Sequence, residues 1–374
     1  MYPLLTINTD YITENAKEIV KRAKQNGVSI TAVTKCFGGN REVASALLKG
    51  GIKIIGDSRI ANLEKFKDLP CQKWMIRIPS LSECDQIVEY ADVSLNSEIT
   101  TIRQLNHSAF KKGVRHGVIL MIDVGDLREG WFLGDGTSES TEVDNLMDNS
   151  VAEIMNTIIE ILSMSNIDFV GIGANETCFG GVIPTPSTFK EIIWLKQYIE
   201  KSFNIACPVI SGGNSSSYHL LDSNILPSDI NNLRLGELIL FGREPAMNIC
   251  YSYLHQDSFI LHVEIVELKN KPSVPVGKIG RDAFGKIPHF EDKGIRKRAI
   301  CALGRQDTDV DNLTPLDKGM TIEGASSDHM IIDITGSRKK YKVGDVIKLV
   351  CNYSSALHIC TSEYIEKKTR NRFF

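Results

Sequence analysis

Several features that would place this chain in a special class of protein are missing from it. The opening residues, MYPLLTINTDYITENAKEIV, lack the basic start and apolar run of a secretory signal. No stretch approaches the roughly 18 consecutive apolar residues of a membrane span. The nine cysteines are scattered, odd in number and form no CxxC pair, so neither a zinc site nor a disulfide framework is indicated. We therefore expect a cytoplasmic protein with reduced thiols and no bound metal.

A strong charge of either sign is also missing. The 374 residues include 43 basic and 46 acidic side chains, which gives a net charge of -3. This balance provides no long-range attraction toward nucleic acid or anionic lipid, so small molecules or other proteins are the expected partners. The length suggests two domains, although a single barrel can absorb most of it.

The first 240 residues alternate between short β-branched runs and longer stretches of helical period, a pattern typical of βα units around a parallel sheet. Eight such repeats indicate a closed (β/α)8 barrel rather than an open doubly wound sheet. The predicted strands are Ser29–Lys35, Ile52–Asp57, Lys73–Ile78, Asp92–Asn96, Gly117–Val124, Phe169–Ala174, Pro208–Ser211 and Asn232–Leu235. Predicted helices between them include Arg41–Lys49, Ser80–Tyr90, Val151–Ser165 and Thr188–Ser202. The polar stretch 134–149 is expected to be a surface loop leading into a helix.

The pattern changes after Gly242. From about Ser258 the chain shows period-two runs, FILHVEIVEL, RKRAICAL, HMIIDIT and DVIKLVCNY, punctuated by glycine and proline. We predict an α/β TIM barrel over residues 1–245 and an all-β domain over residues 246–374, with the boundary inside 242–257. The extended residues Leu4–Asn8 can join either part, and residues 1–9 are candidates to pack with the β domain.

Function in a barrel lies at the carboxyl ends of the strands, and here those ends are polar. Lys35 follows the first strand, where it is either a solvated lysine or a desolvated amine that can form an imine. The next residue, Cys36, is either reactive or a packing cysteine.

A second feature lies after the seventh predicted strand, where the chain reads SGGNSSS. This segment is either a flexible turn or an anion site built from backbone N–H groups and hydroxyls. Gly236, after the eighth strand, can bring another N–H to the same anion. Barrels commonly bind phosphate with the loops after strands seven and eight. An imine-forming lysine and a phosphate site on one barrel face together suggest pyridoxal phosphate.

With these residues in view, the chain resembles the alanine racemase family, and most closely its ornithine and lysine racemase branch. The resemblance covers nearly the whole chain and rests on AVTKCFGGN, DVGDLREGWF, SGGNSSS, LRLGELILFG, PSVPVGKIGRDAFG and GASSDHMIID. It implies a pyridoxal phosphate enzyme in which Lys35 forms the imine, Arg234 faces the pyridine nitrogen and Arg128 places the substrate carboxylate. Asn175 stands where the family often has a histidine near the cofactor ring. The implied phosphate ligands are Ser211, Gly213, Asn214, Ser215, the backbone of Gly236 and Glu237, and Tyr353.

The chain departs from this family at one position. In alanine racemases a tyrosine from the partner subunit is the second acid/base group, and the matching segment here, 277–285, has no tyrosine. One alignment register puts Phe284 at the position of that tyrosine, and another register puts Asp282 there. Only Asp282 can carry a proton, and its alternative role is that of a turn residue. Ser327 and Asp328 stand where the family contacts the substrate carboxylate, or they belong to a turn.

The leading hypothesis is a pyridoxal phosphate-dependent amino-acid racemase, acting on ornithine, lysine or a similar basic amino acid as a homodimer with shared active sites. One alternative is a decarboxylase of the same architecture, a family that presents an acidic residue to the pyridine nitrogen where this chain has Arg234. The other is a carrier that binds the cofactor without turnover. No acidic cluster in the sequence identifies the partner of a distal ammonium group.

Overall fold

The computed structural model describes residues 1–134 and 140–371. The chain folds into two compact units: Tyr11–Lys35 with Gly39–Gln256, and Met1–Asp10 with Cys36–Gly38 and Asp257–Phe374. The division predicted between residues 245 and 246 falls between β11 (Arg243–Glu244) and β12 (Ile249–Cys250). These two strands pair with each other, and both lie in the larger unit.

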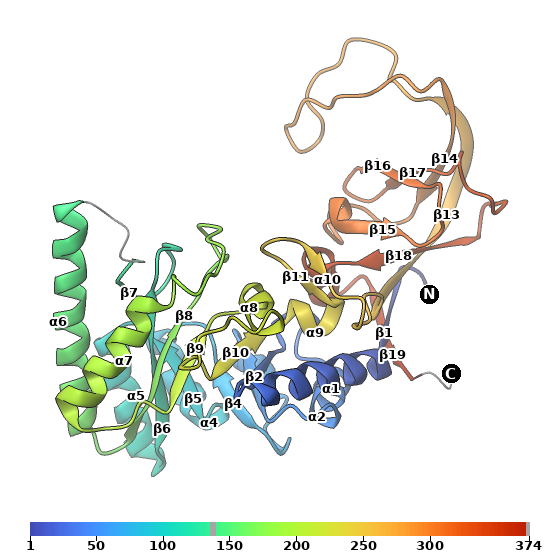
Figure 1. The fold of residues 1–374 in the computed structure, drawn as a ribbon. Coiled ribbons are helices and arrows are strands. Elements are labelled where there is room, and N and C mark those ends of the chain that lie inside the picture. The colour runs from blue at the N-terminus through green and yellow to red at the C-terminus, as the bar shows by residue number, and fades with distance from the viewer. Residues whose placement is uncertain (135–139, 372–374) are drawn as a thin grey trace. The chain divides into compact units, whose positions relative to one another are not determined.

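The larger unit is built on a closed ring of eight parallel strands. Their order is β5-β4-β3-β2-β10-β9-β8-β6, and pairing of β5 with β6 closes the ring. The strands are β2 (Ser29–Val33), β3 (Ile54–Asp57), β4 (Gln72–Met75), β5 (Val93–Asn96), β6 (His116–Asp123), β8 (Ile167–Ala174), β9 (Val209–Gly212) and β10 (Asn232–Leu235). Figure 1 shows the ring with its helices, and the predicted (β/α)8 barrel is confirmed.

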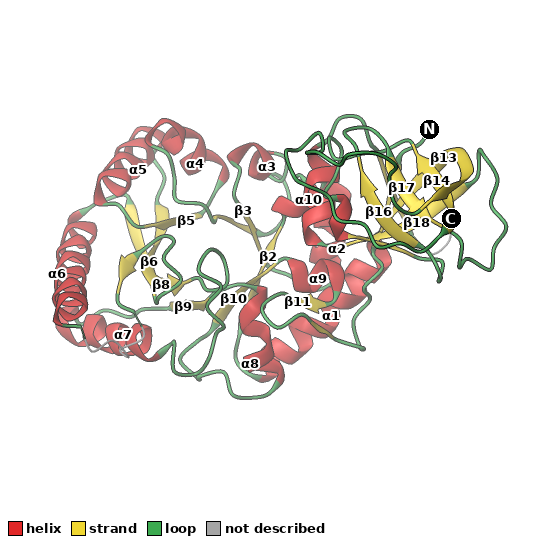
Figure 2. Ribbon diagram, turned by 90° about the horizontal axis from the view of Figure 1, so that it is seen from above, coloured by secondary structure: helices red, strands yellow, loops and turns green. Residues whose placement is uncertain are grey.

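Helices surround this ring, as the view from above in Figure 2 shows. They are α1 (Thr9–Gln25), α2 (Arg41–Lys49), α3 (Ile60–Glu64), α4 (Cys84–Tyr90), α5 (Ile99–Lys112), α6 (Thr141–Ser163), α7 (Lys190–Phe203), α8 (Tyr218–Asp222) and α9 (Glu237–Phe241). Short 3-10 turns are η1 (Lys35–Phe37), η2 (Leu81–Glu83) and η3 (Ser215–Ser217). The helix α2 has the predicted bounds because Asn40 caps its first turn, accepting from the N–H groups of Glu42 and Val43. Within the described ranges, every helix is too short or too polar to cross a membrane.

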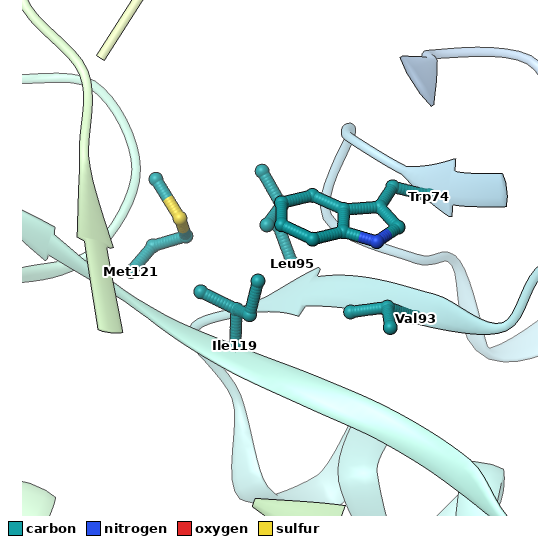
Figure 3. Close-up of a cluster of buried hydrophobic side chains, with 5 residues drawn as sticks. All are labelled: Trp74, Val93, Leu95, Ile119 and Met121. Atoms are coloured by element: carbon teal, nitrogen blue, oxygen red, sulfur yellow. The ribbon is translucent and has the colours of Figure 1, made fainter. Parts of the chain in front are cut away.

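The barrel interior is packed with apolar side chains. Trp74, Val93, Leu95, Ile119 and Met121 form one buried cluster and point toward one another in Figure 3. They come from β4, β5 and β6. Residues of β3, β8 and β9 also pack against this cluster, so it contacts strands around much of the ring. The barrel therefore has a solid core, and chemistry is confined to the rim.

One element of the barrel differs from the prediction. The stretch 134–149, expected to be a surface loop leading into a helix, is helical from Thr141, so the helix begins earlier than predicted, while residues 135–139 lie outside the described part. Acidic Glu142 and Asp144 in the first turn favour a helix N-terminus. The segment reads as a loop in the sequence because this end of α6 is almost wholly exposed, and an exposed helix is as polar as a loop.

The smaller unit is an eight-stranded sheet, mostly antiparallel. Its strands are β1 (Leu4–Asn8), β13 (Phe259–Pro272), β14 (Ile295–Cys301), β15 (Leu313–Pro315), β16 (Thr321–Ala325), β17 (Met330–Asp333), β18 (Val346–Cys351) and β19 (Glu366–Arg370). The N-terminal strand β1 pairs with β13 and β19. A 3-10 turn, η4 (Val310–Asn312), and one helix, α10 (Tyr353–Thr361), complete it. The predicted β domain after the barrel is confirmed, with α10 added.

Candidate active site

Lys35 follows the carboxyl end of β2, and the residue before it is held firmly. The Thr34 N–H donates to the Gly56 carbonyl at 2.9 Å, and the Thr34 hydroxyl donates to Asp57 Oδ2 at 2.5 Å. Asp57 is fully buried at the end of β3, and burial raises its pKa although several hydrogen bonds oppose the shift. These contacts anchor the end of β2, so that half-buried Lys35 begins its 3-10 turn from a rigid base.

Arg234 places a buried positive charge at the same end of the barrel. Its guanidinium donates to the Ala174 carbonyl at 2.6 Å, to Asn175 Oδ1 at 2.5 Å and to the Ser211 hydroxyl. Burial lowers the pKa of Arg234 to about 10, while the negative charge of Glu129 opposes this shift. The side chain therefore remains cationic at neutral pH.

Asn175 extends this hydrogen-bonded network to the loop after β6. Its amide Nδ2 donates to Glu129 Oε1. Arg128 donates to the same oxygen through Nη2 at 2.5 Å, and its Nε pairs with the other oxygen of Glu129. Arg234 joins Asn175 to Ser211, and Glu129, which was not predicted from the sequence, joins Asn175 to Arg128.

The Gly/Ser loop after β9 is compact. Gly213 has φ +90, and a Cβ there would lie 2.9 Å from Ser217 Oγ, so only glycine fits. Asn214 accepts from the Ser216 N–H at 2.8 Å and donates to the Glu176 carbonyl at 2.7 Å. The Ser216 and Ser217 hydroxyl oxygens are buried and have no hydrogen-bond partner in the described part of the chain.

Residues that follow β10 contact this loop. The Ser215 hydroxyl accepts from the N–H groups of Gly236 and Leu238, at 3.3 and 3.2 Å. The Gly236 N–H, predicted to face an anion, therefore points at Ser215. Glu237 begins α9, and burial raises the pKa of its carboxyl to about 7.

An acidic side chain lies next to the Gly/Ser loop. Glu176 is fully buried, and among residues 1–134 and 140–371 its two carboxyl oxygens have no hydrogen-bond partner. Burial, followed by repulsion from Asp126, raises the pKa of Glu176 to about 7. The nearby Thr188 hydroxyl donates to the Thr185 carbonyl instead, at 2.9 Å. Much of the Glu176 population is therefore uncharged at neutral pH.

Asp126 joins the loop after β6 to the loop after β8. Its carboxylate accepts from the backbone N–H groups of Cys178, Phe179 and Val182, at 2.8, 2.9 and 3.1 Å. Asp126 is fully buried, and its carboxylate accepts hydrogen bonds from three backbone N–H groups. It therefore connects the two loops.

Asp282, Ser327 and Tyr353 belong to the smaller unit, so the barrel network does not include them. Asp282 is an exposed turn residue between β13 and β14, whose Oδ1 accepts from the N–H groups of Phe284 and Lys286, at 2.9 and 2.8 Å. Ser327 is an exposed residue between β16 and β17. Tyr353 begins α10, and its carbonyl accepts from the Cys36 thiol at 3.7 Å.

Comparison with known proteins now bears on this arrangement. The family model described as alanine racemase, N-terminal domain, matches residues 7–245. The chain is 44% identical to ornithine racemase of Acetoanaerobium sticklandii, covering 98% of this chain and 99% of that protein. It is 38% identical to lysine racemase of Thermotoga maritima, covering 98% of both. This chain belongs to the alanine racemase family.

A solved structure of the family agrees in fold. Alanine racemase from Bartonella henselae, which carries covalently bound pyridoxal phosphate, superposes with a TM-score of 0.69 at 14% identity, over 98% of this chain and 99% of that one. The family predicted from the sequence is confirmed, and with it the enzyme class of a racemase.

In this member of the alanine racemase family, three polar residues of the candidate site were not predicted from the sequence: Asp126, Glu129 and Glu176. A signal for them was present, because all three follow predicted barrel strands, in the loops that carry Arg128 and Asn175. What the sequence did not indicate is which of them point inward.

Proposed function

We propose that this chain interconverts the L- and D-enantiomers of an amino acid with a basic side chain, ornithine and lysine being the first candidates, with pyridoxal phosphate as cofactor. The observation that carries the proposal is the buried network of Arg234, Asn175 and Ser211 on the barrel end where β2 presents Lys35. The relatives named ornithine racemase and lysine racemase, alike over nearly their whole length, support the substrate class.

The residues present fit this cofactor. Lys35 would hold it through its amine. The buried hydroxyls of Ser216 and Ser217 lack partners, and the open backbone at Gly213 leaves no side chain over them, so the loop suits a phosphate. We assign the remaining phosphate contacts to Asn214, Ser215, the backbone N–H of Glu237 and Tyr353, and the ring contacts to Arg234 and Asn175. The Ser211 hydroxyl, predicted as a phosphate ligand, instead donates to Asn232 and accepts from Arg234, and the Gly236 N–H is bonded to Ser215. When bound, pyridoxal phosphate makes the Cα–H of an attached amino acid acidic because its ring accepts electrons.

Racemisation requires one group to remove the Cα proton and another to return a proton to the opposite face. We assign one face to the Lys35 amine. We assign the other to Asp282 of a second copy in a homodimer, since this carboxylate is exposed and Phe284 has no proton to give. Arg128 and Ser327 would orient the substrate carboxylate, Arg128 through a charge-assisted hydrogen bond.

Arg234 favours racemisation over decarboxylation. A guanidinium that stays cationic at neutral pH would disfavour protonation of the cofactor's ring nitrogen, and this would weaken the electron sink. The decarboxylase hypothesis expects an acidic side chain at this place, and the residue here is a buried arginine bonded to three neighbours.

Solvent exchange tests the function. The protein loaded with pyridoxal phosphate would be incubated in deuterated water with a panel of L- and D-amino acids. We expect deuterium at Cα and formation of the opposite enantiomer with ornithine or lysine, and a rate well below this with alanine. Absence of exchange with every amino acid would refute the proposal, and carbon dioxide release would indicate a decarboxylase.

A further inference from the structure

Glu129 is the shared acceptor of two groups at the barrel rim. Its side chain is only 16% exposed, and it accepts from Arg128 through Nε and Nη2 and from the Asn175 amide. Asn175 in turn accepts from Arg234. One carboxylate therefore joins the loop after β6 to the loop after β8 and, through one amide, to β10.

The loop that carries Glu129 is held in a constrained conformation. Leu127 has φ +56, and the Asp123 carboxylate accepts from the N–H groups of Gly125 and Leu127, at 2.9 and 3.1 Å. At Gly130 a Cβ would lie 2.7 Å from the Met121 carbonyl oxygen, so this turn requires glycine. A non-glycine residue at positive φ persists where the surroundings enforce it, and such sites cluster at functional positions.

Asn175 is well suited to connect an arginine with a carboxylate. An amide has an acceptor end and a donor end, and here the acceptor faces Arg234 while the donor faces Glu129. The two charged neighbours thus dictate the amide orientation. An amide does not titrate, so the connection persists across the working pH range.

The charges of the network are unequal. Burial is the largest effect and disfavours the Arg234 charge, Glu129 favours it, and Arg128 opposes it. Two guanidinium groups thus share one carboxylate at a largely buried place, where an uncompensated charge is costly. Glu129 is the only carboxylate among these named groups.

We propose that Glu129 is a positioning residue, which through Asn175 fixes the Arg234 guanidinium and at the same time holds the Nε and Nη2 edge of Arg128. This leaves Nη1 of Arg128 as the edge that the network does not use, available for the substrate carboxylate. The inference rests on the proposed function for the cofactor and the substrate, but its first two readouts require only that the cofactor binds.

The test compares E129Q with E160Q in the protein loaded with pyridoxal phosphate. Glu160 also pairs with an arginine, Arg103, but on the outer helices α5 and α6, so it controls for loss of a glutamate–arginine pair. The first readout is the visible absorbance of the bound cofactor as a function of pH. The negative charge of Glu129 raises the pKa of Arg234. In E129Q, Arg234 should therefore lose its proton at a lower pH. We expect the change in cofactor absorbance that accompanies this loss to begin at a lower pH than in the wild type and in E160Q.

The second readout is cofactor affinity of the apoprotein in a double-mutant cycle with N175L. If Glu129 acts through Asn175, each single change weakens binding by about tenfold or more, and the double change is little worse than either alone. Unchanged spectra and affinity in E129Q, or fully additive effects, would overturn the proposal. Neither readout needs a substrate, so both remain informative if racemisation itself is not observed.

The third readout separates positioning from direct substrate recognition. A positioning role lowers kcat for ornithine and alanine by a similar factor. If instead E129Q removes only the preference for ornithine over alanine and leaves the spectra unchanged, then Glu129 binds the distal ammonium and the positioning role is wrong.

Discussion

Arg234 and Glu176 are two buried, ionisable residues at the carboxyl end of the barrel that differ in their hydrogen bonding. Arg234 is bonded to three neighbours, whereas both oxygens of Glu176 lack a hydrogen-bond partner within the described residues. A satisfied buried charge stabilises its partners, and an unsatisfied one shifts its protonation instead. The two side chains therefore predict different behaviour, one in stability and the other in pH dependence.

Replacing Arg234 by glutamine is expected to destabilise the apoprotein. Glutamine cannot serve Ser211, Ala174 and Asn175 together, and each buried polar group left unpaired costs about 1–3 kcal/mol. We expect the free energy of unfolding, measured with urea, to fall by about 2–4 kcal/mol. The control R103Q breaks an exposed pair with Glu160 and should change it by less than about 1 kcal/mol. If R234Q and R103Q lower the free energy of unfolding equally, the three hydrogen bonds of Arg234 do not contribute the expected stability.

The carboxyl of Glu176 makes stability depend on pH. Its pKa is about 7 in the folded protein and close to 4.5 when unfolded, so the folded state binds more protons between these values. The free energy of unfolding should therefore fall as pH rises from about 4.5 to 7, by about 3 kcal/mol from this group, and then level off.

Unfolding of E176Q across the same pH range measures the contribution of Glu176. The slope should become shallower but persist in part, because burial also raises the pKa of Glu237 to about 7. The variant E237Q supplies the matched comparison. An unchanged slope in E176Q would show that its carboxyl is not held uncharged by the fold.

At the scale of elements, the site combines strand ends with the loops that follow them. The ends of β9 and β10 carry Ser211 and Arg234. The loops after β6, β8 and β9 carry Glu129, Asn175 and 213–217, and Asp126 fastens the first loop to the second. A change that disturbs one loop without unfolding its strand should therefore affect cofactor binding more than stability.

Gly213 allows this to be tested within the Gly/Ser loop. In G213A the new Cβ would meet Ser217 Oγ and displace a hydroxyl assigned to the phosphate. We expect the affinity for pyridoxal phosphate, measured by titration of the apoprotein, to fall at least about tenfold. The control is G113A, at the end of α5, where φ is also positive but nothing lies within 4 Å of the Cβ. It should lose about 1 kcal/mol of stability and keep its affinity. Equal affinities would place the phosphate elsewhere.

At the scale of the whole molecule, the prediction concerns sharing of active sites between subunits. If Asp282 acts in the site of a second copy, K35A and D282N are each inactive for different reasons. Mixed in equal amounts with subunit exchange, about half of the dimers are heterodimers with one intact site of two. Racemisation should therefore recover to about one quarter of the wild-type rate. If native mass spectrometry shows that subunits have exchanged but racemisation does not recover, the proposed role of Asp282 is wrong.

The sequence by itself determined the barrel, the β domain and the family, because each depends on local patterns that survive without coordinates. Alternation of β-branched runs with helical stretches specifies βα units, and motif order along the chain specifies the family. It also predicted Lys35, Arg128, Asn175, Ser211 and Arg234 as site residues, since strand ends can be counted along a sequence. Polarity alone misjudged 134–149, because an exposed helix and a loop share the same composition.

Only the tertiary structure decided which of these side chains meet. Lys35 and Arg234 are far apart in sequence, yet β2 and β10 are hydrogen-bonded neighbours in the barrel. Glu129 reads as one more surface acid until the fold brings β6 and β8 side by side and places its carboxylate against Asn175. The physical reason is that a hydrogen bond depends on distance and direction between side chains, and closure of the ring sets both. Local sequence preference sets neither.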